Sequence, residues 1–130
     1  MNKKLPVIIL LLTVSALIAF TFAACIPKGS IIILEDRDGK GVLAELKEYD
    51  KVDKWELPLS KGDEVRVEVE RVEGIIGLTV SGKKGSEPYN GSKLEPGAFT
   101  FTVEESDTYV FILRGSKATG KITVRNLGQQ

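Results

Sequence analysis

Apolar and polar residues alternate along most of the chain after residue 30, with the two-residue period of a β-strand. The clearest case is Val65, Val67 and Val69, which alternate with charged residues. Residues 109–113 are apolar without a break, a pattern typical of a strand that is covered on both faces. Short strands are predicted at residues 31–34 (buried), 42–47, 54–59, 65–70, 76–80, 98–103, 109–113 and 122–124.

Turn-forming residues separate these segments at intervals of about eight to twelve residues, and no window beyond the first 24 residues has a helical period. The pattern predicts an all-β fold: a single antiparallel β-sandwich of about seven to eight strands, of the jelly-roll or immunoglobulin-like type. We expect residues 98–114 to form a central hairpin. Strand 54–59 should lie at an edge because Pro58 cannot donate a hydrogen bond to a neighbouring strand.

The first 24 residues read as a targeting segment that forms an apolar signal helix. Two lysines precede a long apolar run, which ends in Phe22-Ala23-Ala24-Cys25. These four residues resemble the bacterial lipobox, although its usual first residue is leucine. The resemblance implies cleavage between Ala24 and Cys25 and attachment of lipid to the Cys25 thiol. The chain would then be a lipoprotein, with palmitate or a similar acyl group holding it in the membrane.

Two other readings of the leader stay open. Twenty apolar residues are also long enough to span a bilayer as an uncleaved signal anchor, and an ordinary cleaved leader would release a secreted protein. All three readings place the domain outside the cytoplasm. The predicted organisation is a signal peptide at 1–24, a short lipidated tether at 25–30, a β-sandwich domain at 31–126 and a tail at 127–130.

Residues 54–125 carry a second resemblance. Lys54-Trp55-Glu56-Leu57 is followed by Lys61-Gly62-Asp63 and the valine strand, and the later segments 98–103, 107–111 and 119–124 complete the pattern. This order is similar to bacterial pre-peptidase C-terminal-type domains, and GOLD-type sandwiches share its ending. The resemblance implies an accessory or interaction module without catalytic residues.

Composition narrows the classes of function. The chain has 18 basic and 18 acidic residues; two of the lysines, Lys3 and Lys4, belong to the leader, so the remainder has 16 basic against 18 acidic residues and a net charge of −2. This balance argues against nucleic-acid binding. Histidine is absent and Cys25 is the one cysteine, so an internal disulfide and a thiolate metal site are excluded. No cofactor, metal or catalytic residue is predicted.

Two short motifs have plainer explanations than chemistry. Ser81 and Lys84 match the Ser-x-x-Lys spacing of acyl-transfer enzymes, but that chemistry needs a helix and these residues lie in a glycine-rich turn region. Asp36 and Asp38 resemble part of a calcium loop that lacks its remaining oxygen ligands. We interpret the first as a chance match and the second as a hairpin turn.

Two aromatic residues are candidates for stacking on a sugar. Trp55 shares a face with Leu57 and Leu59, so we expect it in the core. Tyr89 and its neighbour Asn90 lie in a polar loop and form the candidate ligand surface, although a tyrosine covering the base of its own loop is the plainer alternative.

The sequence therefore predicts a membrane-anchored, extracytoplasmic β-sandwich that binds rather than catalyses. The first hypothesis is a protein-interaction or assembly module of the cell envelope, with an envelope protein as partner. The alternative is a carbohydrate-binding module that takes a polysaccharide. An enzyme is disfavoured because no histidine, free catalytic cysteine or recognisable pair of acids is present.

Overall fold

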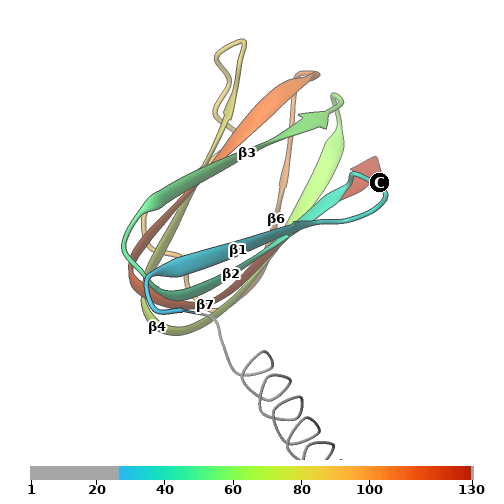
Figure 1. The fold of residues 1–130 in the computed structure, drawn as a ribbon. Helices are drawn as coiled ribbons and strands as arrows, with labels where there is room; N and C mark the ends of the chain where they lie inside the picture. Colours follow the sequence, from blue (N-terminus) through green and yellow to red (C-terminus); the bar gives the residue numbers. More distant parts are fainter. Residues whose placement is uncertain (1–26, 130) are drawn as a thin grey trace, which may run out of the picture.

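The structure is a computed structural model that describes residues 27–129, so the predicted leader and Cys25 lie outside the described residues. Within that range the fold is all-β and antiparallel, as predicted (Figure 1). No helix among residues 27–129 has the length and apolar character needed to cross a membrane. The strands are β1 (Ser30–Glu35), β2 (Gly41–Tyr49), β3 (Val52–Leu59), β4 (Asp63–Gly82), β5 (Tyr89–Gly91), β6 (Gly97–Thr102) and β7 (Asp107–Gln129).

Two long, bent strands, β4 and β7, pair with each other along most of their length and belong to both layers of the fold (Figure 1). In the first layer, the N-terminal half of β4 pairs with β6, and the C-terminal half of β7 pairs with β2, which pairs in turn with β1. In the second layer, the C-terminal half of β4 pairs with β5, and the N-terminal half of β7 pairs with β3. The sandwich is therefore one sheet folded over on itself.

Glycines allow the fold in this sheet. Gly74 of β4 has φ +77°, and a Cβ atom at this position would lie 2.1 Å from the carbonyl oxygen of Lys117 on β7. The register of the two strands shifts on both sides of Glu73. Glycine accepts both the positive φ and this close approach, so Gly74 permits the bend at this point of β4.

The core lies between the two layers and follows the predicted alternation. The three valines of β4, Val65, Val67 and Val69, all face inward and are at most 3% exposed. Trp55 of β3 stacks on Phe111 of β7, with ring centroids 5.5 Å apart and an interplanar angle of 13°. Trp55 is 7% exposed, which confirms its predicted place in the core.

The predicted central hairpin is wrong. β6 pairs with β4 in the first layer, whereas the residues of β7 that follow it pair in the second layer with β3 and β4. The segment between them crosses from one layer to the other, and Val103 in this segment is held by a hydrogen bond from its N–H to the carbonyl oxygen of Asp63. The hairpin was predicted because the two segments are close in sequence. In the structure, β6 and the start of β7 lie in different layers, and both contribute side chains to the core between them.

Other boundaries also differ from the prediction. Glycines at residues 74, 115 and 120 suggested breaks, but β4 and β7 continue through them as bends. The predicted polar loop contains the short strand β5, and β7 runs beyond residue 126 to Gln129. β1 was predicted as a buried strand, but it is an edge strand with Ile32 38% and Leu34 56% exposed. β3 pairs only with β7, so its predicted edge position is confirmed.

Candidate functional site

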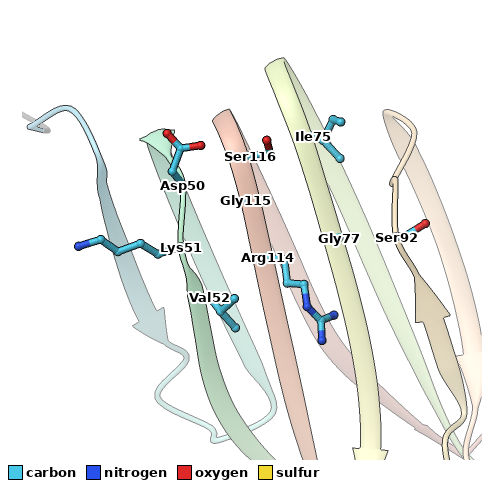
Figure 2. Close-up of a pocket in the computed structure, with 9 residues that line it drawn as sticks. All are labelled: Asp50, Lys51, Val52, Ile75, Gly77, Ser92, Arg114, Gly115 and Ser116. Carbon is cyan, nitrogen blue, oxygen red and sulfur yellow. The ribbon is translucent and has the colours of Figure 1, made fainter.

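An open cleft lies in the second layer close to the bends of β4 and β7, where the loop between β2 and β3 meets these two strands (Figure 2). Its volume is about 320 Å³, and Val52, Ile75, Gly77, Arg114 and Gly115 are among the residues that line it. The strand register explains the hollow, because the Cα partner of Arg114 on β4 is Gly77, which has no side chain to fill the space.

Arg114 lies in the cleft at one end of a short polar chain across three strands, with Thr79 at its centre. Its Nη1 donates to Oγ1 of Thr79 on β4 over 3.0 Å, and Thr79 donates to Oδ1 of Asn90 on β5 over 3.3 Å. Thr79 is 7% exposed, whereas Arg114 is exposed. The buried threonine therefore fixes one corner of the guanidinium and leaves its other donors facing solvent.

Apolar side chains continue from the cleft along the outer face of the second layer. Val110 and Ile112 of β7 alternate with the core residues of that strand, so they point outward, where they are half-buried. Val52 and Ile75, at the rim of the cleft, are 53% and 41% exposed. We call these four residues with Arg114 the β3–β7–β4 face. No further layer of residues 27–129 covers it.

Both outer faces of the sandwich carry an ion pair. On the first layer, Arg66 of β4 forms an ion pair with Glu68 over 2.9 Å. On the second layer, Glu56 of β3, the Cα partner of Val110, forms an ion pair with Lys83 over 3.0 Å. Neither the Lys54 ammonium nor the Arg114 guanidinium lies within 4.0 Å of a carboxylate of the described residues. The β3–β7–β4 face therefore combines apolar side chains with Arg114, a cation without an ion-pair partner among the described residues, and it borders the Glu56–Lys83 pair.

The two residues of the predicted ligand surface fall on opposite sides of β5. The ring of Tyr89 stacks on Phe99 with centroids 4.6 Å apart, and it lies 5.9 Å from the ring of Phe101, at one margin of the core. Burial raises the pKa of the Tyr89 hydroxyl. Asn90 is exposed on the outer face and accepts the hydrogen bond from Thr79. Of the two, Asn90 is the residue that the structure joins to the cleft.

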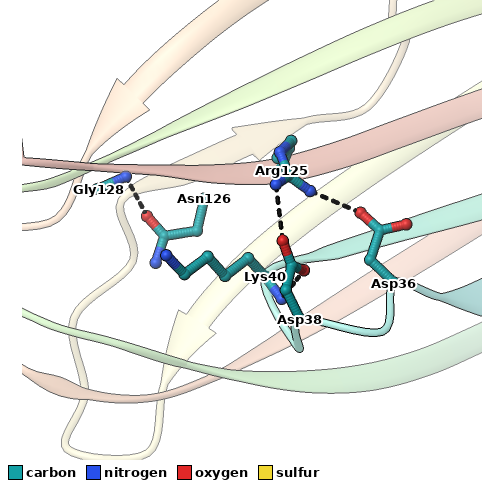
Figure 3. A network of polar contacts seen from close by, with 6 residues as sticks. All are labelled: Asp36, Asp38, Lys40, Arg125, Asn126 and Gly128. Carbon is teal, nitrogen blue, oxygen red and sulfur yellow. Dashed lines mark hydrogen bonds and ion pairs between the residues drawn. The ribbon is translucent and has the colours of Figure 1, made fainter.

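The aspartates of the β1–β2 turn already contact a cation from their own chain (Figure 3). Arg125 of β7 contacts Oδ2 of Asp36 and Oδ2 of Asp38, both over 2.8 Å. The backbone N–H of Lys40 also donates to Asp38, and this bond, with the one from Arg125, holds the pKa of the Asp38 carboxyl below its usual value of 3.8. The turn is thus tied to β7 by charge-assisted bonds.

The Ser-x-x-Lys match has no helix in the structure. Ser81 lies near the end of β4, and Lys84 lies in the turn after it. The Lys84 side chain donates to the carbonyl oxygen of Ser106, and its backbone N–H donates to Asp107. Among residues 27–129, no group of three or more metal-ligating side chains is close enough together to hold a metal ion.

Sequence reasoning missed Arg114 and the cleft around it. Arg114 directly follows the apolar run at residues 109–113, and Gly115 follows Arg114. The pairing of Arg114 with Gly77 depends on the register between β4 and β7. The unbroken apolar run at residues 109–113 was the signal that could have pointed to this face, because it predicted that something covers the outward side chains of the strand.

Comparisons with known proteins assign no family. No family model matches the chain, and no curated protein matches it in sequence. Among solved structures, PliG of Aeromonas hydrophila, a periplasmic lysozyme inhibitor of g-type lysozyme, has 13% identity and a TM-score of 0.48 over 72% of this chain and 92% of its own.

Two streptococcal structures are also similar. The Glycosylation Associate Protein (Gap123) complex from Streptococcus agalactiae has 11% identity and a TM-score of 0.42, over 75% of this chain and 45% of its own. The accessory secretory protein 1, 2 and 3 structure from Streptococcus pneumoniae has 12% identity and a TM-score of 0.38, over 75% and 85%. At these values the similarities carry no conclusion about what this chain binds.

Proposed function

We propose that this chain is a lipid-anchored, extracytoplasmic protein whose β-sandwich is a non-catalytic protein-interaction module of the cell envelope. The β3–β7–β4 face is its docking surface. The observation that carries the proposal is the outward position of Val110 and Ile112 on β7, a strand with neighbours on both sides, with no described residues layered over them. Covering such a face with a partner removes apolar area from water, which is the main source of association energy.

The composition of the face supports a protein partner. Binding hot spots are typically apolar or aromatic side chains beside an arginine, at the centre of a desolvated patch. Here Val52 and Ile75 border a hollow that contains Arg114. On the first layer, Arg66 and Glu68 of β4 form an ion pair, and the exposed apolar residues Ile32 and Leu34 lie on the edge strand β1.

The carbohydrate alternative has less support. Sugar-binding sites commonly present an aromatic ring as a stacking platform, and the candidates for this role were Trp55 and Tyr89. Trp55 is in the core, and Tyr89 stacks on Phe99. No aromatic residue lines the cleft. We therefore keep the protein-interaction function as the proposal.

The anchor is part of the proposal and rests on the sequence. Pro27 and Gly29 precede β1, where the N–H of Gly29 donates to the carbonyl oxygen of Lys47. Cys25 lies two residues before Pro27, so a lipid on its thiol would hold this end of the sandwich within roughly 10–20 Å of the bilayer. Cys25→Ser should abolish fatty-acid labelling and block maturation of the chain; unchanged labelling would exclude the lipid anchor.

Site-specific photo-cross-linking tests the docking surface in the full chain. A benzoyl-phenylalanine is placed at Val52 on the β3–β7–β4 face or at Thr100, which is exposed on β6 of the first layer. The proposal expects a discrete protein adduct in intact cells from position 52 and none from position 100. Equal yields from both positions, or no protein adduct from position 52, would overturn it.

A further inference from the structure

Arg114 differs from Arg66, Arg71 and Arg125 in what its guanidinium contacts. Arg66, Arg71 and Arg125 each lie within 4.0 Å of a carboxylate, at 2.9, 3.9 and 2.8 Å respectively. The contact of Arg114 is the hydroxyl of Thr79, a neutral acceptor. A guanidinium has five N–H donors in a planar fork, so most of its donors have no acceptor among the described side chains.

Two glycines line the cleft beside Arg114. Gly77 is the Cα partner of Arg114, and a Cβ there would lie 3.0 Å from the carbonyl oxygen of Ser92. A Cβ at Gly115 would lie 2.7 Å from the carbonyl oxygen of Tyr49. Close backbone contacts therefore favour glycine at both positions, most strongly at Gly115.

The charges around the hollow set the chemistry of its occupant. Lys51 and Arg114 both line the cleft, and Figure 2 shows the Lys51 side chain extending away from Arg114. The carboxylate of Asp50, at the rim, accepts the N–H of Lys117 over 2.7 Å. One oriented guanidinium beside Val52 and Ile75 suits a single carboxylate, which it can bind through two parallel hydrogen bonds. A phosphate dianion would favour several converging donors.

We propose that the cleft binds an aspartate or glutamate side chain of the partner protein, with Arg114 as its ligand and Val52 and Ile75 as contacts for apolar residues beside it. This inference rests on the proposed function and adds the chemistry of the partner. Thr79 acts as a positioning residue, because its hydroxyl holds the guanidinium in place. Lys54, one row along β3, adds a second positive charge that favours approach of an acidic segment.

Capped peptides test this chemistry on the full chain in detergent micelles. Three pentapeptides carry Glu, Gln or Lys between two leucines, and binding is followed by NMR shifts of the Arg114 Nε–H and the Gly115 amide. We expect the Glu peptide to bind roughly 10-fold or more tightly than the Gln peptide. Arg114→Gln should abolish this preference, Arg114→Lys should retain part of it, and the matched control Arg66→Gln should leave it unchanged.

Several outcomes would overturn the inference. These are equal binding of the Glu and Gln peptides, no shift at about 10 mM Glu peptide, or an unchanged preference in Arg114→Gln. Stronger shifts with inorganic phosphate or with vesicles containing anionic lipid would assign the cleft to a phosphate group instead. None of these results affects the cross-linking test at position 52, so failure of the inference and failure of the proposed function are distinguishable.

Discussion

The Nη1 of Arg114 and the Oγ1 of Thr79 are 3.0 Å apart, which joins an exposed cation to a threonine that is 7% exposed. This bond orients the guanidinium relative to the sheet rather than leaving it free in solvent. A long side chain that is ordered before binding loses less entropy when a partner arrives. The bond is therefore central to the account of the cleft.

Thr79→Val should weaken binding of an acidic peptide by roughly 3- to 10-fold, because valine keeps the shape of threonine but cannot accept the bond from Arg114. The ¹⁵Nε heteronuclear NOE of Arg114 should fall in the same variant. Thr108→Val is the matched control, since Thr108 lies further along the outer face of β7. An unchanged NOE in Thr79→Val would show that Thr79 does not position the guanidinium.

Gly74→Ala should destabilise the domain more than Gly128→Ala. Both glycines have φ +77°, which costs a side chain about 1–2 kcal/mol. At Gly74 the added Cβ would also lie 2.1 Å from the carbonyl oxygen of Lys117, whereas no atom lies within 4 Å of a Cβ at Gly128. Urea unfolding followed by the fluorescence of Trp55 measures the difference. Equal losses would mean that the bend in β4 does not depend on this close approach.

Asp63→Ala should lower the free energy of unfolding by about 1–3 kcal/mol, because it leaves two donors without their acceptor. The Asp63 carboxylate accepts from the N–H of Ser60 over 2.8 Å and from Nδ2 of Asn126 over 3.1 Å, and Asp63 is 7% exposed. Glu104→Ala, at an exposed position, is the control and should change stability little. A loss at Asp63 no larger than that at Glu104 would contradict this role.

The Asp38 carboxylate should stabilise the folded domain, and this stabilisation should be lost when acid protonates it. Its folded-state pKa is lowered, first by the N–H of Lys40 and then by Arg125, so the contribution is present above its usual pKa of 3.8 and disappears as the pH falls through the folded-state value. Asp38→Asn should therefore lower Tm at pH 6, and the gap to the parent chain should narrow below pH 3.8. A gap that is constant from pH 6 to pH 2 would count against the linkage.

Local patterns in the sequence predicted the class of fold because burial in a sandwich requires period-two alternation. The alternation that begins at Val65 predicted the valine strand of β4, and Pro58 predicted the edge position of β3. The pairing of strands could not be predicted in the same way. A glycine such as Gly74 or Gly120 is compatible both with a turn that ends a strand and with a bend inside one long strand. The site escaped prediction for this reason: Arg114 meets Gly77 only through the register of two long strands.

The most direct test of the central claim is the yield of the position-52 cross-link in intact cells, compared between two backgrounds that each lose one arginine. Arg114→Gln removes the cation of the cleft, and Arg66→Gln makes the same chemical change on the opposite layer. We expect the protein adduct to fall roughly 10-fold or more in Arg114→Gln and to persist in Arg66→Gln. An adduct that persists equally in both backgrounds, or is lost equally from both, would contradict docking on the β3–β7–β4 face through Arg114.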